Sequence, residues 1–254
     1  MKAKKSLGQN FLMDKNIIKR IVDLVDAKEN DLVLEIGPGR GALTKELVNK
    51  DFQFVAIELD HDMDEYLNKL NAQIIYEDIL KVDLLNILKD YQYDKLYVVG
   101  NLPYYITSPI LERLVQMEIK PDKMIFMVQK EVAVRYASKE GSSDYGFMSL
   151  FLQFYYDLKE ELFVHKKAFL PVPKVDSEVI SLSKKKEYPD VDFNKFMKFL
   201  KKAFQFKRKT LKNNLREFDW DIIKQVLIEN GLSEDVRSES ISREIFVKIY
   251  NSLK

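Results

Sequence analysis

The stretch Leu-Val-Leu-Glu-Ile-Gly-Pro-Gly-Arg-Gly, residues 32–41, predicts the fold of most of the chain. Its first half is an apolar run typical of a buried strand, and its glycines at every second position predict a tight turn. A strand, a glycine-rich turn and a helix in this order mark the place where an open α/β sheet binds a nucleotide-like ligand. The spacing Gly-x-Gly-x-Gly differs from the Gly-x-Gly-x-x-Gly of dinucleotide-binding proteins.

Further short apolar runs follow at intervals of roughly 20–25 residues, which is the spacing of βα units. Between them, apolar residues recur at helical intervals, and a helix with Asp14 as its N-cap is expected at 14–26. The runs are almost continuously apolar, as buried parallel strands are. We therefore predict an α/β, Rossmann-like, doubly wound sheet. The expected strands are 32–36, 54–59, 72–78, 95–101 and 124–129.

The pattern changes after about residue 140. Two aromatic-rich runs, 145–169 and 170–183, flank a Pro-Val-Pro bend and are expected to be later strands at the sheet edge. The remaining chain has helical patterns at 192–205, 208–217, 220–230 and 242–252. A lysine run followed by Pro189 predicts a domain boundary, which gives a first domain of residues 1–185 and a small helical domain of residues 186–254.

Composition excludes several kinds of chemistry. The 254 residues contain no cysteine and only two histidines, His61 and His165, so we expect no metal site built from thiolates or several histidines and no cysteine nucleophile. A Ser-His-Asp hydrolase would have to use one of those two histidines. The N-terminus lacks the apolar segment of a signal peptide, and no run of 18 uncharged apolar residues occurs, so a cytoplasmic protein without membrane contact is expected.

Charge is distributed unevenly along the chain. Residues 1–20 carry a net charge of +5, residues 21–183 carry −10 and residues 184–254 carry +6. This distribution favours a polyanion held by the two ends and a small cationic ligand in the middle, although charged runs are also common as solvated faces.

Three acidic residues stand at the ends of predicted strands: Glu35, Glu58 and Asp78. Glu58 lies 21 positions after Gly37, where a carboxylate can accept hydrogen bonds from ribose hydroxyls. Three carboxylates would repel a pyrophosphate but suit S-adenosylmethionine, which has a cationic sulfonium. The alternative is that Glu58 and Asp78 only cap the helices that follow them.

The fourth strand ends in Asn101-Leu102-Pro103-Tyr104. The Asn101 side-chain oxygen and the Leu102 carbonyl can each accept one N–H of a planar exocyclic amine, and Pro103 stiffens the turn without adding a donor. Tyr104 can stack on an extruded base. The alternative is a simple tight turn made of turn-favouring residues.

These segments resemble the ribosomal RNA adenine N6-dimethyltransferases, in particular the bacterial small-subunit enzymes. The similarity spans nearly the whole chain and includes Ser6–Leu12, Glu35–Gly41, Asn101–Tyr104 and Phe169–Val179. The resemblance implies that the methyl donor, S-adenosylmethionine, is contacted by Asn10, Leu12, Gly37, Glu58, Asp78 and Asn101. Tyr105 departs from the family pattern, which often has Asn there, and the chain is somewhat short.

The resemblance also implies dimethylation of two adjacent adenosines near the 3′ end of small-subunit rRNA, an rRNA-processing step in ribosome biogenesis, by a monomer acting on the assembling 30S subunit. Three alternatives remain at this stage. They are a large-subunit (23S) rRNA methyltransferase of the macrolide-resistance type, a non-catalytic RNA-binding assembly factor, and, more distantly, an NAD-dependent dehydrogenase.

Residues 195–216 hold nine basic residues and no acidic one, interleaved with phenylalanines. Helical spacing predicts that Phe196 and Phe199 are core residues rather than base-stacking residues and that the cations face outward. Lys2, Lys4 and Lys5 can flank the same RNA or belong to a disordered tail. The expected RNA-binding residues are Lys201, Lys202, Lys207, Arg208, Lys209 and Lys212.

Overall fold

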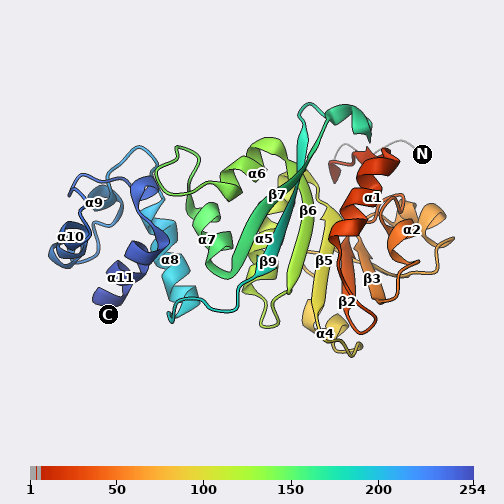
Figure 1. The fold of residues 1–254 in the computed structure, drawn as a ribbon, viewed down its shortest axis with the longest axis horizontal. Helices are drawn as coiled ribbons and strands as arrows, with labels where there is room; N and C mark the ends of the chain where they lie inside the picture. Colours follow the sequence, from red (N-terminus) through yellow and green to blue (C-terminus); the bar gives the residue numbers. More distant parts are fainter. Residues whose placement is uncertain (1–3, 5–6) are drawn as a thin grey trace. The chain divides into compact units, whose positions relative to one another are not determined.

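The computed structural model describes residue 4 and residues 7–254, and it divides into two compact units (Figure 1). Lys2, Lys5 and Ser6 lie outside the described residues. Unit 1 consists of Met1–Ala133 and Asp157–Lys184, and unit 2 of Val134–Tyr156 and Lys185–Lys254. Unit 2 thus includes a segment, 134–156, that the sequence pattern assigns to the first domain.

Unit 1 is built on a seven-stranded sheet with the order β4-β3-β2-β5-β6-β9-β7. Neighbouring strands from β4 to β6 are parallel, and β9 runs antiparallel to β6. The prediction of a doubly wound α/β sheet is confirmed. The strands are β2 (Leu32–Ile36), β3 (Gln53–Glu58), β4 (Gln73–Tyr76), β5 (Leu96–Asn101), β6 (Lys123–Gln129), β7 (Tyr156–Val164) and β9 (Ser177–Lys184).

Helices cover the sheet because its central strands are apolar on both faces. All five residues of β2 are buried. On one face, Ile18, Ile21 and Val22 of the first helix pack against the sheet, and Asp14 caps that helix as predicted. The helices of unit 1 are α1 (Lys15–Leu24), α2 (Thr44–Leu47), α3 (Asp64–Leu67), α4 (Leu84–Leu88) and α5 (Thr107–Gln116), and α6 (Lys130–Ala137) begins in unit 1 and ends in unit 2.

The predicted extended run 145–169 is wrong in its first half. Residues Phe147–Tyr155 form a helix, α7, and only then does the edge strand β7 begin. Six of the nine residues of α7 are buried. A helix that is apolar on nearly all sides has no polar stripe, so its sequence shows no helical period and resembles a buried strand.

The order of the strands in the sheet indicates at which edge a ligand can bind. After β2 the chain builds outward through β3 and β4, then returns to the other side of β2 to form β5 and β6. This reversal between β2 and β5 is the topological switch point, where open α/β sheets bind ligands at the carboxyl ends of the strands. A separate antiparallel pair, β1 (Phe11–Leu12) with β8 (Phe169–Leu170), joins the N-terminal segment to the Pro-Val-Pro region.

Unit 2 contains α7 and the C-terminal helices. The helix predicted at 208–217 is reduced to four residues, because Thr210 caps it at the start and Leu215 ends it. None of the helices in the described part of the chain is long and apolar enough to cross a bilayer. The C-terminal helices are α8 (Phe193–Ala203), α9 (Leu211–Asn214), α10 (Trp220–Glu229) and α11 (Arg243–Ser252).

Candidate functional site

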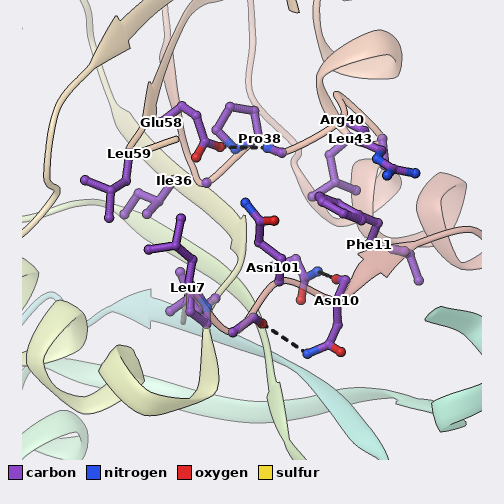
Figure 2. A pocket seen from close by; sticks show the side chains of 18 of the residues that line it. Leu7, Asn10, Phe11, Ile36, Pro38, Arg40, Leu43, Glu58, Leu59 and Asn101 are labelled. Carbon is purple, nitrogen blue, oxygen red and sulfur yellow. Dashed lines mark hydrogen bonds between the residues drawn. The ribbon is translucent and has the colours of Figure 1, made fainter. Parts of the chain in front are cut away.

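A cavity of about 510 Å³ opens at the switch-point edge of the sheet in unit 1. This volume is in the range of pockets that bind small ligands, roughly 300–1,000 Å³. Figure 2 shows Glu58, Asn101 and Asn10 around it, although they come from three distant parts of the sequence. The cavity is lined by all of the predicted donor-binding and catalytic residues: Asn10, Leu12, Gly37, Glu58, Asp78, Asn101, Leu102, Pro103 and Tyr104.

The glycine turn forms one wall. Gly37, Gly39 and Gly41 have φ values of +67°, +55° and +75°, which side chains disfavour. A Cβ atom on Gly37 would meet nothing within 4 Å. The backbone of Gly37 is therefore open to the cavity, so a ligand can approach it closely.

Glu58 ends β3, and its carboxylate is held by the backbone. The N–H groups of Gly39 and Asp60 donate to its two oxygens at 2.9 and 2.8 Å. Its side chain is nearly buried, and burial raises the pKa of Glu58 against the opposing effect of these hydrogen bonds. Asp60, rather than Glu58, caps the helical turn that follows, so Glu58 is positioned as part of the cavity wall.

Asp78 does not cap the next helix, because the N-cap of α4 is Asp83. Asp78 accepts a hydrogen bond from the Leu80 N–H at 2.9 Å and so stabilises the turn after β4, and it also lines the cavity. Glu35 differs from the other two acids. Its side chain is buried and accepts a hydrogen bond from the Thr44 hydroxyl at 2.7 Å, and burial raises the pKa of Glu35 to about 8. Of the three strand-end acids, Glu58 and Asp78 line the cavity and Glu35 does not.

The Asn101 side chain is fixed by the N-terminal segment. Its Nδ2 donates to the Asn10 carbonyl oxygen at 2.9 Å, a bond that spans 91 positions of the sequence. This bond sets the orientation of the amide (Figure 2). Leu102 is buried and its N–H donates to the Met127 carbonyl at 3.2 Å, which fixes the backbone beside Asn101.

The Tyr104 hydroxyl lies 2.7 Å from the hydroxyl of Ser177, the first residue of β9. Burial raises the pKa of Tyr104, so the phenol remains protonated at neutral pH. Sequence reasoning did not assign Ser177 to the site. The signal was present, because Ser177 belongs to the Phe169–Val179 segment that the resemblance identified.

The N-terminal segment is held by two sets of contacts. Its strand β1 pairs with β8, and Gln9 Nε2 and Lys4 Nζ contact the Asp60 carboxylate at 2.7 and 2.6 Å. Burial raises the pKa of Asp60, but the bonds from Lys4 and Gln9 outweigh it, and the pKa is lowered. This link also went unpredicted, because nothing in the sequence indicates that residues 51 positions apart meet.

A family model described as ribosomal RNA adenine dimethylase matches residues 1–254. The chain belongs to the ribosomal RNA adenine dimethylase family. A relative from Mycoplasma mycoides, named ribosomal RNA small subunit methyltransferase A, is 42% identical over 259 residues, which cover 99% of this chain and 97% of the relative. The protein of that name from Staphylococcus carnosus is 39% identical over 267 residues, which cover 99% of this chain and 90% of that relative.

Two solved structures show the fold of this adenine dimethylase family member. A dimethyladenosine transferase from Plasmodium falciparum aligns with a TM-score of 0.78 at 24% identity, covering 94% of this chain and 95% of that one. The 23S rRNA methyltransferase ErmE aligns with a TM-score of 0.71 at 23% identity, covering 96% and 99%. The fold is therefore the Rossmann-like fold of class I methyltransferases.

The predicted RNA-binding residues of this adenine dimethylase lie in unit 2. Phe196 and Phe199 are buried, which confirms that they are core residues. Of the cations, Lys202 pairs with Glu217, and Lys212 lies 5.5 Å from the Trp220 ring. The remaining predicted RNA-binding residues are Lys201 at the end of α8 and Lys207, Arg208 and Lys209 in the loop before α9, all of them exposed.

Proposed function

We propose that the protein transfers methyl groups from S-adenosylmethionine to N6 of two adjacent adenosines near the 3′ end of small-subunit rRNA, two groups to each. The observation that carries this proposal is that the Asn101 amide and the Glu58 carboxylate, both held by backbone groups, line one cavity at the switch point. The first supplies the acceptor for an amine, and the second supplies the acceptor for ribose hydroxyls.

The chemistry of the cavity wall fits the methyl donor. Two carboxylates, Glu58 and Asp78, suit a ligand whose reactive centre is a sulfonium cation, and the open backbone at Gly37 leaves room for it. Asn10 and Leu12 from the N-terminal segment complete the proposed donor site. When bound, S-adenosylmethionine supplies a methyl group on a positively charged sulfur.

The protein's own residues orient the target amine. Because Asn101 Nδ2 donates to the Asn10 carbonyl oxygen, the Oδ1 of the same amide is directed to accept one N–H of the adenine, and the Leu102 carbonyl accepts the other. Pro103 adds no competing donor, and the Tyr104 ring stacks on the extruded base. Because a methyl group on a cationic sulfur would already be activated, positioning of the amine and exclusion of water would suffice without a strong base. The proton that the amine loses on methylation would pass to solvent.

The small subunit is favoured as substrate because relatives covering nearly the whole chain are named ribosomal RNA small subunit methyltransferase A. Lys201, Lys202, Lys207, Arg208, Lys209 and Lys212 are proposed to contact phosphates of this RNA. Action on an assembling 30S subunit would take place in the cytoplasm, by one copy of the chain.

The test is to incubate the protein and isotope-labelled S-adenosylmethionine with unmethylated small subunits or, separately, with large-subunit rRNA, and to identify labelled nucleosides by mass spectrometry. We expect N6,N6-dimethyladenosine from the small subunit and none from Asn101→Ala. Label only in large-subunit RNA would favour a 23S methyltransferase. Tight, salt-sensitive binding to small subunits without label would favour a non-catalytic assembly factor.

A further inference from the structure

Phe206 has a large apolar side chain that is exposed to solvent in unit 2. It lies in the loop between α8 and α9, and 54% of it is exposed. The nearby Phe204 behaves differently, because its ring packs against Tyr145 and Phe246. Burying a phenylalanine contributes about 1.5–3 kcal/mol to a fold, and Phe206 does not make that contribution.

The backbone of Phe206 is nevertheless held firmly. The Asn214 side chain accepts the Phe206 N–H at 3.2 Å and donates to the Phe206 and Ala203 carbonyls at 3.3 and 2.7 Å. The Lys209 N–H also donates to the Phe206 carbonyl at 3.0 Å. The ring is therefore presented to solvent from a defined backbone position, which reduces the entropy that a binding partner must overcome.

Cations follow the ring directly. Lys207, Arg208 and Lys209 are exposed, and none of them forms an ion pair within the part of the chain that the structure describes. Lys202 on the neighbouring helix does pair, with Glu217. An exposed aromatic ring beside cations without acidic partners matches the chemistry of single-stranded nucleic acid. Its unpaired bases can stack on the ring, and its phosphates can contact the cations.

We propose that Phe206 stacks on an unpaired base of the RNA substrate, while Lys207, Arg208 and Lys209 contact its adjacent phosphates. This base is distinct from the target adenosine, which is proposed to bind at Asn101–Tyr104. The inference rests on the proposed function only in taking rRNA as the partner. It adds an apolar, salt-independent contribution to a surface that is otherwise electrostatic.

The test is a binding titration, with unmethylated small subunits as the probe, at several salt concentrations. Phe206→Ala is expected to weaken binding about 5- to 150-fold with an unchanged salt slope, and Phe206→Leu to recover little of that loss. Lys207→Ala is expected to reduce the salt slope by about one. Ile228→Ala is the matched control, because Ile228 is 56% exposed on α10, and it is expected to bind like the parent chain.

Phe206→Trp provides a direct reading of stacking. The substituted ring is expected to retain affinity and to lose fluorescence when RNA binds, relative to the parent chain, in which Trp220 is the sole tryptophan. Unchanged affinity of Phe206→Ala, full recovery by Phe206→Leu or unquenched emission from Phe206→Trp would each overturn the proposal. Because these readouts measure binding, they are independent of whether the protein methylates the small subunit, which the nucleoside experiment decides.

Discussion

The phenol oxygen of Tyr104 and the hydroxyl oxygen of Ser177 lie 2.7 Å apart, across 73 positions of the sequence. Tyr104 follows the Asn101 turn, and Ser177 is fully buried at the start of β9, where it pairs with Gln129 of β6. A rigid sheet position therefore fixes the rotation of the ring that is proposed to stack on the target base. The Phe169–Val179 segment thus supports the site twice, through Ser177 and through the pairing of β8 with β1.

Tyr104→Phe and Ser177→Ala are each expected to lower kcat about 2- to 12-fold, because each removes one hydrogen bond of roughly 0.5–1.5 kcal/mol. The double variant is expected to be no slower than the slower single variant, since both changes remove the same contact. The measurement is a double-mutant cycle on methyl transfer to small subunits. Ser181→Ala is the control, because Ser181 is also buried in β9 but bonds to Glu161, away from the cavity. Independent, additive losses would show that the hydrogen bond does not position the ring.

Sequence patterns predicted the parts of this protein that depend on local chemistry. The sequence predicts that the glycine turn, Glu58 and the Asn101 turn lie at one edge of the sheet. This prediction needs no long-range contact, because the carboxyl ends of parallel strands lie at the same edge. The helix α7 was missed because burial removes its helical period. Ser177 and Asp60 were missed because their roles depend on which distant side chain each one meets.

Asp60 connects the N-terminal segment with the proposed ribose site. Its N–H holds Glu58 and its carboxylate holds Gln9 and Lys4. Asp60→Asn removes the charge but keeps the N–H, so we expect the Kd for S-adenosylmethionine to rise about 10-fold with kcat nearly unchanged at saturation. Isothermal titration with the donor and steady-state kinetics separate the two effects.

Asp62→Asn serves as the control for that change, because Asp62 also contacts Lys4 but is more exposed and does not contact Gln9. A much smaller rise in Kd is expected. The lowered pKa of Asp60 and the raised pKa of Lys4 mean that this pair stays charged at neutral pH. Donor binding should therefore lose this contribution only as pH falls through the lowered pKa of Asp60 or rises through the raised pKa of Lys4. An equal effect of Asp62→Asn would argue for a general electrostatic effect instead.

The raised pKa of Glu35 predicts that the stability of the protein depends on pH. This pKa is raised from 4.5 to about 8 by burial, with a further contribution from Glu58. Between these two values the unfolded chain releases a proton that the folded protein retains, so rising pH favours unfolding by about 1.4 kcal/mol per pH unit from this group. Glu35→Gln should remove that pH dependence. Near pH 8.5 the free energy of unfolding of the variant should therefore exceed that of the parent chain by on the order of 4 kcal/mol.

Thermal unfolding between pH 5 and pH 9 measures this difference. The parent chain is expected to lose stability from pH 5 to about pH 8, the pKa of Glu35 in the folded protein, with no further loss from this group above it, and Glu35→Gln to lose less. Glu29→Gln changes an exposed carboxylate and should follow the parent chain. Parallel curves for the parent chain and Glu35→Gln would show that Glu35 is ionised in the folded protein at neutral pH.

Two glycines at the switch point should respond differently to alanine. A Cβ on Gly100 would lie 2.5 Å from the Ile36 carbonyl oxygen, where β5 and β2 approach each other beside the cavity. That atom belongs to the backbone of a buried strand and has no room to move. Gly100→Ala is therefore expected to destabilise the protein by about 1–3 kcal/mol and to lower its Tm.

Gly37→Ala meets no such obstacle, since its Cβ would have nothing within 4 Å, but it points into the space proposed for the donor and requires a φ of +67°. The strained backbone is expected to cost about 1–2 kcal/mol, with a larger loss in donor affinity than in Tm. Gly146→Ala, where φ is extended and the space is open, is the control for donor affinity and should leave the donor Kd unchanged, with only a small fall in Tm because Gly146 is the N-cap of α7. Donor Kd and Tm measured together distinguish the two sites, because Gly100→Ala acts first on folding and Gly37→Ala first on binding. Full donor affinity in Gly37→Ala would mean that the donor does not approach the glycine turn.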